Sequence, residues 1–306
     1  MINLLSEPRI KFTNTINEKP IIKLNILKSF SFQIFFLFCT LFYIHSNVYC
    51  LDSLKTRHTT ILQDLGNDIV TGLQDAGNYY TSPLRFNSSA WFYTGMLIDG
   101  IAVSTTLDYN IKQKASRNNV TSYNHDFWDI PTAYGDVIYP ASASGIIYAF
   151  GLFTRNDKIR VTGRLLIEAL GIAGVSVTTL KFITGRDRPF YRNDPYWFKA
   201  FQTKNEHLSF SSGHAAVAFA VSSVLAERFD NNYLRVGLYG FAALTAYARI
   251  HNNQHWFSDV VLGSLIGFSS GYFVVHREQD RNENKTKNGG FSIYPSLNGL
   301  GVVWKF

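Results

Sequence analysis

The stretch GRLLIEALGIAGVSVTTLKFITGRDRP, residues 163–189, is an apolar run that ends in a cluster of charged side chains. Its part from 163 to 182 has the length and composition of a buried helix, and Pro189 ends the helical pattern. The end of this helix therefore presents Lys181 and Arg188, and the planar guanidinium of Arg188 matches phosphate oxygens. Alone, the segment is weak evidence for a site, because a basic helix end usually only complements the helix dipole.

Apolar segments of helical length also fill most of the remaining chain, and clusters of Gly, Asn, Asp and Pro separate them. They cover approximately residues 89–107, 131–154, 213–228, 233–250 and 256–276. No internal repeat of fixed period is visible. We therefore predict an all-α fold, a bundle of about six core helices.

A further helix is predicted for residues 61–80, ahead of the main helical domain at 89–276. Apolar residues recur there at an interval of four, which places them on one helix face: Ile61, Leu65, Ile69 and Leu73. Asp64, Asp68 and Asp75 point away from this face. Residues 51–88 are therefore expected to form an amphipathic helix and a connecting loop.

The first fifty residues differ from the rest of the chain. No residue between Lys28 and Asp52 carries a fixed charge, and five basic and two acidic side chains precede this run. A basic segment followed by an apolar run is typical of a secretory signal or a single membrane anchor. We expect residues 1–50 to direct export, with a buried core helix as the alternative. Both cysteines, Cys39 and Cys50, lie in this segment.

The last thirty residues change in character again. Residues 277–290 are rich in charge, which predicts a solvated linker. Residues 291–306, FSIYPSLNGLGVVWKF, contain two apolar segments about Asn298-Gly299, a dipeptide favoured in tight hairpins. We therefore predict a linker and a short β-hairpin-like tail over residues 277–306.

Composition limits the class of function. With 46% hydrophobic and 17% charged residues, the chain is not disordered over most of its length. A formal net charge of +7 would suit nucleic acid, an anionic membrane or a phosphorylated substrate. Because the leader holds an excess of basic residues, the remainder is only mildly basic, and we expect no nucleic-acid partner.

A second polar segment, Ser211-Ser212-Gly213-His214, precedes the apolar run at 215–228. Ser212 can cap a helix, and Gly213 permits close approach of a ligand to the backbone. The first N–H groups of a helix bind anions, and His214 would then stand beside the bound anion as a proton donor. Alone, such a segment is more often an ordinary helix start with a surface histidine.

A third segment contains Arg249, His255 and Asp259. His255 and Asp259 are four residues apart, so on a helix they share one face. A carboxylate that holds one imidazole nitrogen leaves the other nitrogen available as a nucleophile. Arg249 would add a positive charge for the same anion. The alternative is a surface pair that contributes a few tenths of a kcal/mol.

In order and spacing, Lys-x6-Arg-Pro, Ser-Gly-His and Arg-x5-His-x3-Asp together resemble the type 2 phosphatidic acid phosphatase (PAP2) superfamily, over roughly residues 90–276. This superfamily includes membrane lipid phosphatases, bacterial non-specific acid phosphatases and vanadium haloperoxidases. Ser211 stands where proline usually precedes Ser-Gly-His, and Ala248 stands where serine usually precedes the arginine.

The resemblance implies a PAP2-type helical bundle and a phosphatase. His255 would attack phosphorus to form a phosphohistidine, Asp259 would orient His255, and His214 would protonate the leaving group and then activate water. The remaining motif residues would bind the phosphate oxygens: Lys181, Arg188, Ser212, Gly213 and Arg249. We expect no cofactor and no metal, because the sequence offers no carboxylate, His or Cys cluster suited to Mg²⁺ or Zn²⁺.

Aromatic residues near the motifs favour a phosphorylated lipid as substrate: Phe190, Tyr191, Tyr196, Trp197, Phe198 and Trp256. With the expected export, this predicts membrane association and an active site on the periplasmic side of the cell envelope. A soluble phosphate ester is the alternative substrate. A vanadium-dependent haloperoxidase and a non-catalytic envelope protein are the alternative functions.

Membrane crossing is harder to predict from the sequence. A spanning helix needs about 20 largely apolar residues, and after the leader only Val137–Thr154 is charge-free over a comparable length. We therefore expect a bundle whose interior is protein, with membrane contact on one face. Tilted or atypical spans are the alternative.

Overall fold

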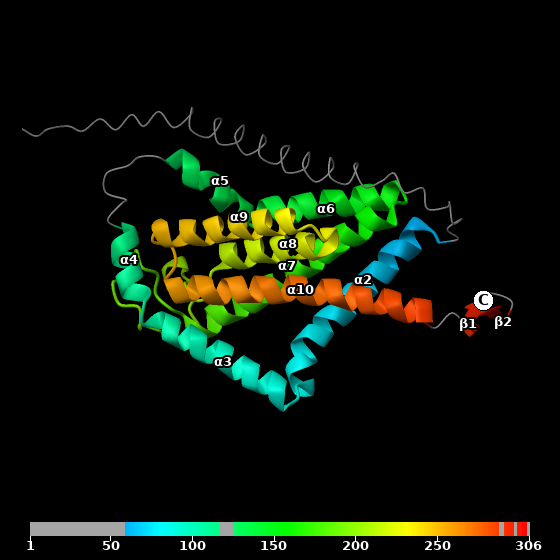
Figure 1. The fold of residues 1–306 in the computed structure, drawn as a ribbon, viewed down its shortest axis with the longest axis horizontal. Helices are drawn as coiled ribbons and strands as arrows, with labels where there is room; N and C mark the ends of the chain where they lie inside the picture. Colours follow the sequence, from blue (N-terminus) through cyan, green and yellow to red (C-terminus); the bar gives the residue numbers. More distant parts are fainter. Residues whose placement is uncertain (1–58, 117–124, 288–290, 297–298, 305–306) are drawn as a thin grey trace, which may run out of the picture. The chain divides into compact units, whose positions relative to one another are not determined.

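The computed structural model describes residues 59–116, 125–287, 291–296 and 299–304 (Figure 1). The predicted leader, residues 1–50, lies outside them. In these ranges all regular secondary structure is helical except for two short strands, which confirms the all-α prediction.

The helices, in chain order, are α2 (Ile61–Thr81), α3 (Ser88–Thr105), α4 (Asp108–Ser116), α5 (His125–Gly135), α6 (Ile138–Phe153), α7 (Asp157–Thr184), α8 (Gly213–Phe229), α9 (Asn232–His251) and α10 (Phe257–Lys287). Two single 3-10 turns, η1 (Ser82–Arg85) and η2 (Asn205–His207), lie in the loops. Strands β1 (Phe291–Ser296) and β2 (Gly299–Trp304) pair antiparallel, as expected of a hairpin, and Asn298 of the expected turn lies outside the described residues.

Most helices agree with the sequence prediction, and three regions differ. The segment predicted as one helix at 131–154 is two helices, α5 and α6, which bend by 56° at their junction. Asp136 lies in this junction and its carboxylate accepts a hydrogen bond from the Ile138 N–H at 3.1 Å, so the side chain caps the start of α6. The short helix α4 was not predicted, because its sequence is polar and carries no apolar periodicity.

The predicted solvated linker is also wrong over most of its length, because α10 continues through Lys287. Glu278 is buried and forms ion pairs with Arg164 of α7, at 2.5 Å, and with Arg281, at 2.8 Å. Arg281 also donates to Asp75 of α2 at 2.7 Å. Three charges of this segment, those of Arg277, Glu278 and Arg281, instead pair with side chains of α2 and α7, while Asp280 and Glu283 are exposed.

Helix α8 lies at the centre of the bundle and packs against α7, α9 and α10 (Figure 1). The contact with α10 is made almost backbone to backbone. A Cβ atom on Gly263 would lie 2.3 Å from the Ser212 carbonyl oxygen, and one on Gly267 would lie 2.1 Å from the Ala216 carbonyl oxygen. Only glycine permits this approach. As a result the Ser212 N–H donates to the Asp259 carbonyl at 2.9 Å, so two of the motifs meet.

Helix α2 packs with its acidic face toward the bundle. Asp75 is completely buried and Asp64 is 4% exposed, and both pair with arginines of neighbouring segments. On the opposite face, Leu62 and Leu73 are 78% and 69% exposed. On a water-soluble bundle, an amphipathic helix normally turns its apolar face toward the core and its charged face toward the solvent.

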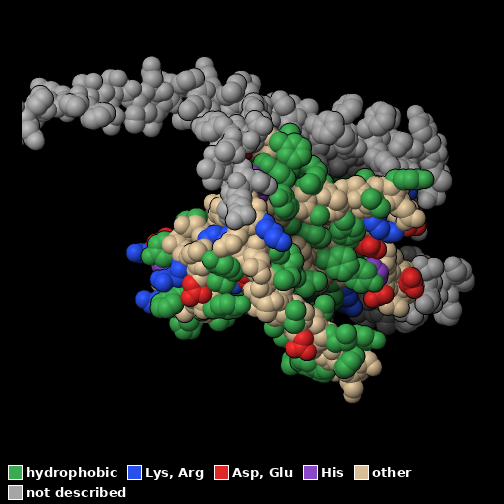
Figure 2. Space-filling model, turned by 60° about the vertical axis from the view of Figure 1, so that its left-hand side comes forward, with side chains coloured by type: hydrophobic (Ala, Val, Ile, Leu, Met, Phe, Trp, Pro, Cys, Tyr) green, Lys and Arg blue, Asp and Glu red, His purple; other side chains and the backbone are tan. Residues whose placement is uncertain are grey.

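Within the described residues, α7 and the part of α10 from Phe257 to Asn284 are long and apolar enough to cross a membrane. The bent pair α5–α6 would be a third if it counts as one span. The sequence prediction accepted only charge-free runs as membrane spans. It therefore missed α7 and α10, each of which contains a few charged residues. Hydrophobic side chains cover much of the face drawn in Figure 2.

Substitution of Gly267 by alanine should destabilise the bundle. The added Cβ would collide with the α8 backbone, which cannot move away as a flexible side chain would, so we expect a loss of about 1–3 kcal/mol in the free energy of unfolding. Denaturant unfolding followed by circular dichroism measures this loss. Gly237→Ala on α9, where no atom lies within 4 Å of the new Cβ, is the control, and it should leave stability unchanged or raise it by up to about 1 kcal/mol. Equal stability of both variants would contradict the packing argument.

Candidate active site

The predicted site residues lie at one end of the bundle, where α7 ends and where α8 and α10 begin. Lys181 is in the last turn of α7, and Arg188 is in the loop that follows. Ser212 caps α8, which starts with Gly213 and His214. Arg249 is in the last turn of α9, His255 lies between α9 and α10, and Asp259 is in the first turn of α10.

Gly185 redirects the chain at the end of α7. Its φ of 56° is in the left-handed region, and a Cβ there would lie 1.6 Å from the Lys199 carbonyl oxygen. The Gly185 N–H donates to the Lys181 carbonyl at 3.0 Å, which closes the helix. This turn brings the loop that carries Arg188 back over the ends of α8 and α10.

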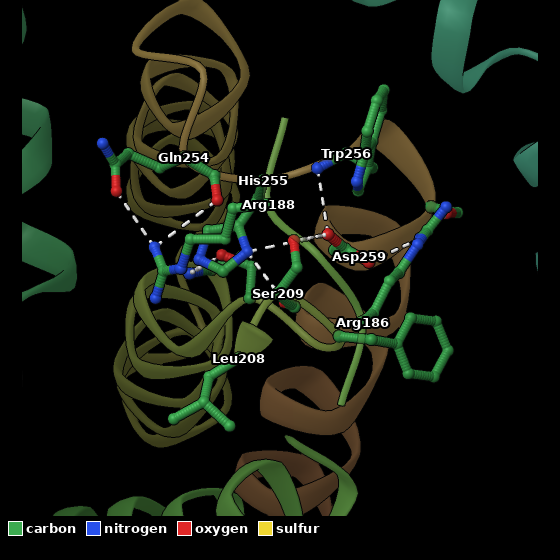
Figure 3. A network of polar contacts seen from close by, with 12 residues as sticks. Arg186, Arg188, Leu208, Ser209, Gln254, His255, Trp256 and Asp259 are labelled. Atoms are coloured by element: carbon green, nitrogen blue, oxygen red, sulfur yellow. Dashed lines mark hydrogen bonds and ion pairs between the residues drawn. The ribbon is translucent and has the colours of Figure 1, made fainter. Parts of the chain in front are cut away.

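His255 is buried, and a backbone carbonyl fixes its ring. Its Nδ1 lies 2.8 Å from the Ser209 carbonyl oxygen (Figure 3). A carbonyl oxygen only accepts, so Nδ1 carries the proton and the lone pair of the neutral imidazole is on Nε2. Burial, together with the positive charges of Lys181 and Arg188, holds the pKa of His255 well below its usual range. The ring is therefore neutral at pH 7.

Asp259 is completely buried and lies 3.7 Å from the His255 Nδ1, beyond hydrogen-bonding distance. Its Oδ2 accepts the Trp256 N–H at 2.9 Å and the Ser209 hydroxyl, and its Oδ1 accepts from Arg186 at 2.6 Å (Figure 3). The carboxylate thus acts on His255 through space and through Ser209. The direct hydrogen bond from imidazole to carboxylate that the sequence suggested is absent, because the Ser209 carbonyl occupies that position.

Arg188 is anchored by protein oxygens. Its Nε donates to the Asn205 carbonyl at 2.8 Å, Nη1 donates to the Gln254 side chain at 2.9 Å, and Nη2 donates to the Asn205 side chain at 2.9 Å. Nη2 keeps a second N–H for an anion. Lys181 donates to the Leu208 carbonyl in the same way. These bonds hold two positive charges in fixed positions.

Arg249 differs from Arg188 because part of its guanidinium is unsatisfied. Its Nε is buried and has no hydrogen-bond partner among the described residues, and the same holds for the Ser211 hydroxyl oxygen. A buried donor without a partner costs about 1–3 kcal/mol. An anion that accepts from Arg249 would remove this cost.

His214 lies in the field of all three cations. Burial lowers the pKa of His214 to about 3, and the charges of Arg249, Arg188 and Lys181 contribute in that order. These shifts require that the three cations lie near one imidazole. The structure therefore brings together the charged residues of all three motifs.

One residue differs from its expected place, and another has the cap role that the sequence suggested. Trp256 was expected in an exposed aromatic rim, but it is 1% exposed and its Nε1 donates to the Asp187 carbonyl at 2.8 Å. The Ser212 hydroxyl accepts from the Ala215 N–H at 3.5 Å, so it serves as the helix cap.

Sequence reasoning missed Arg186 and Ser209, both fully buried beside Asp259. Arg186 stands inside the first motif, two residues before Arg188. The signal available in the sequence was this second arginine in the motif. Ser209 acts mainly through its backbone carbonyl, and no residue type reveals such a contact.

Residues 162–283 match the sequence model of the PAP2 superfamily. This segment is a PAP2 domain. All eight predicted site residues lie inside it, whereas α2 to α6 precede it.

The PAP2 domain has relatives among characterised proteins. The chain is 32% identical to a lipid A 1-phosphatase of Porphyromonas gingivalis over 124 residues, which are 39% of this chain and 25% of that protein. It is 24% identical to a lipid A 4′-phosphatase of the same organism over 134 residues, which are 42% of this chain and 57% of that protein. The chain therefore matches less than two thirds of either relative.

Among solved structures, the chain aligns with the transmembrane PAP2-type phosphatidylglycerolphosphate phosphatase from Bacillus subtilis. It aligns with a TM-score of 0.48 at 18% identity, over 60% of this chain and 95% of that chain.

Acid should destabilise the PAP2 domain through His255, which is buried, and His214, which is partly buried. Their folded-state pKa values lie below the ordinary histidine value of about 6.5, so in acid the unfolded chain binds more protons than the folded chain. The stability that these groups contribute is present above pH 6.5 and is lost as the pH falls toward about 3 for His214. We expect the melting temperature to fall between pH 7 and pH 5, and to fall less in His214→Asn. His276→Asn, at a half-buried position of α10 far along the chain from the motifs, is the control. Identical pH dependence of all three proteins would contradict this electrostatic account.

Proposed function

We propose that this chain is a metal-independent phosphatase that works through a phosphohistidine on the phosphate of a membrane lipid. One observation carries the proposal. His255 has its lone pair on Nε2, and Lys181 and Arg188 lie close enough to lower its pKa. A neutral nucleophile beside fixed positive charges is what attack on a phosphate dianion requires.

In the first step, the His255 Nε2 attacks phosphorus, and the bond between phosphorus and the leaving oxygen breaks. His214 gives its proton to that oxygen, so the product leaves as an alcohol. The negative charge of the bound phosphate opposes the three cations that hold the His214 pKa low, so substrate binding raises this pKa and favours the protonated ring. Asp259, 3.7 Å from Nδ1, stabilises the positive phosphohistidine.

In the second step, a water molecule attacks the phosphohistidine and gives a proton to His214. The bond between nitrogen and phosphorus breaks, its electron pair returns to Nε2, and inorganic phosphate leaves. Negative charge on the equatorial oxygens is stabilised by Lys181, by Arg188, by the unsatisfied Nε of Arg249 and by the N–H groups that start α8 at Gly213.

The arrangement supports metal-independent chemistry, because three side-chain cations take the place that a divalent ion has in other phosphoryl transfer sites. In the part of the chain that the structure describes, no group of three His, Cys, Asp or Glu side chains could hold a metal ion.

Several observations support a lipid substrate. The loop after Arg188 exposes aromatic side chains to between 46% and 60%: Phe190, Tyr191, Tyr196, Trp197 and Phe198. Among the helices that the structure describes, α7 and α10 are apolar enough to cross a membrane, which supports membrane association. The relatives from Porphyromonas gingivalis act on lipid A. A lipid phosphate would place its head group in the site and its chains against the exposed aromatic loop.

We also propose that the site faces the periplasm. The basic and apolar leader predicted at residues 1–50 supports export. Lys181 is near the C-terminal end of α7 and Asp259 is near the N-terminal end of α10, and these two ends meet at one end of the bundle. Spanning helices would therefore place the site at one face of the membrane. Fractionation of the cell envelope with mass determination of the mature N-terminus tests this proposal, and recovery in the cytosol would contradict it.

His255→Ala should lower kcat by at least about 1,000-fold, because no other group at the site supplies the nucleophile. His214→Ala should lower kcat by about 100-fold or more on an alkyl phosphate but much less on p-nitrophenyl phosphate, whose leaving group needs no proton. Steady-state kinetics and rapid-quench trapping of the phosphoenzyme measure these effects.

For both variants, His276→Ala is the control and should match wild type. EDTA should leave the activity intact, and vanadate should inhibit it. Full activity of His255→Ala would remove the nucleophile assignment. Halide oxidation with vanadate and peroxide, without phosphatase activity, would favour the haloperoxidase alternative.

The lipid preference predicts a kcat/KM at least about tenfold higher for phosphatidic acid in vesicles than for glycerol phosphate, since apolar contacts with the chains add binding energy. Tyr196→Ser, which changes an exposed rim residue, should reduce this ratio through KM for the lipid alone. Equal kcat/KM for both substrates would support the alternative, a non-specific phosphatase.

A further inference from the structure

Arg186 is buried between two carboxylates. It is 1% exposed, its Nη1 donates to Asp259 at 2.6 Å, and its Nη2 donates to Asp108 at 2.7 Å. Both carboxylates are completely buried. An isolated buried charge is costly, so the three groups depend on one another.

The guanidinium of Arg186 has little left to offer a substrate. Its Nε and Nη2 both donate to the Pro195 carbonyl, at 2.8 and 2.6 Å, and Nη1 also donates to the Ser258 hydroxyl at 2.8 Å. Protein oxygens thus face all three nitrogens. Arg186 differs in this from Arg249, whose Nε is unsatisfied. The hydrogen bonds of Arg186 are made to protein atoms, so this arginine supports the site and does not bind the substrate.

Asp108 connects this arginine to the start of α10. It is the first residue of α4, and it precedes the PAP2 match at 162–283. Its Oδ1 accepts from the Ser258 N–H at 2.8 Å, and its Oδ2 accepts from the Ser258 hydroxyl at 2.7 Å. Asp108 therefore caps α10 from another helix and at the same time holds Arg186.

These contacts lead to the nucleophile. Arg186 binds one oxygen of Asp259, which leaves the other oxygen for the Trp256 N–H and the Ser209 hydroxyl. The carbonyl of Ser209 in turn accepts from the His255 Nδ1 (Figure 3). The orientation of Arg186 therefore determines where Ser209 presents its carbonyl to His255.

The charges of the group matter as much as its geometry. Asp108, Arg186 and Asp259 together carry one net negative charge beside His255. With Asp108 neutral, the charges of Arg186 and Asp259 would cancel, and their attraction for a positive phosphohistidine would weaken.

We propose that Asp108 and Arg186 are positioning residues, which act on His255 through Asp259 and supply the net negative charge that stabilises its phosphorylated form. This inference rests on the proposed function. Neither residue touches the phosphate, so both should affect the chemical step and spare ground-state binding.

Asp108→Asn tests the proposal, because asparagine keeps the size and one acceptor oxygen but removes the charge. We expect kcat to fall about tenfold or more, which is the effect of removing a residue that orients a catalytic group without touching the substrate. KM and the inhibition constant of inorganic phosphate should stay within about twofold of wild type, since Lys181, Arg188 and Arg249 are unchanged. Steady-state kinetics measure all three quantities.

Ser258→Ala is a second variant that tests the same proposal if Asp108→Asn does not fold. It removes the hydroxyl that joins Asp108 to Arg186 without burying a new charge, and it should lower kcat several-fold with unchanged KM. Arg192→Gln is the matched control. Arg192 pairs at 2.7 Å with Asp187, a buried carboxylate in the loop that carries Arg186, and that pair does not contact Asp259, so kcat should remain within about twofold.

Two results would overturn the positioning role. One is a folded Asp108→Asn or Ser258→Ala protein with the kcat of wild type. The other is a rise in the phosphate inhibition constant in proportion to the fall in kcat, which would mean that the whole site had shifted. An active wild type with an inactive His255→Ala establishes the proposed function separately, so failure of the positioning role is distinguishable from failure of the function.

Discussion

The contact between α8 and α10 determines where the chemistry can occur. Gly263 and Gly267 let the two backbones approach until the Ser212 N–H reaches the Asp259 carbonyl at 2.9 Å. This contact holds the cap of α8 and the first turn of α10 next to each other at the same end of the bundle. His214 follows the cap directly, and His255 directly precedes α10. The positions of both imidazoles thus follow from a contact between two backbones, and the side chains of the site adjust to it.

Positive charges gathered in this way repel one another, and the protein offsets the repulsion with oxygen atoms. Loop carbonyls and amides accept from Lys181 and Arg188, and Asp259 lies behind His255. Arg249 keeps a buried donor without a partner among the described residues. The same repulsion that lowers the pKa of His214 in the free protein becomes attraction when a phosphate dianion binds. The site is therefore preorganised for an anion before one arrives.

Periodicity in the sequence predicted the long helices, because each buries an apolar face, and the order of the motifs predicted which side chains meet. Local patterns could not predict the partnership of Asp108 with Arg186, since these residues are 78 positions apart and pair only after folding. The extension of α10 was missed for a related reason. Charged residues such as Glu278 and Arg281 look solvated in a sequence, and here they pair with α7 and α2.

The orientation of α2 bears on the surroundings of the bundle. Asp75 is completely buried against arginines while Leu73, on the opposite face, is 69% exposed. In water this arrangement would leave apolar surface solvated, which is unfavourable by roughly 25 cal/mol per Å². Against lipid the same orientation is favourable, because charges pair inside the protein and apolar side chains contact acyl chains. The face that α2 turns outward therefore supports membrane association independently of the apolar lengths of α7 and α10, since it depends on where the charges are buried.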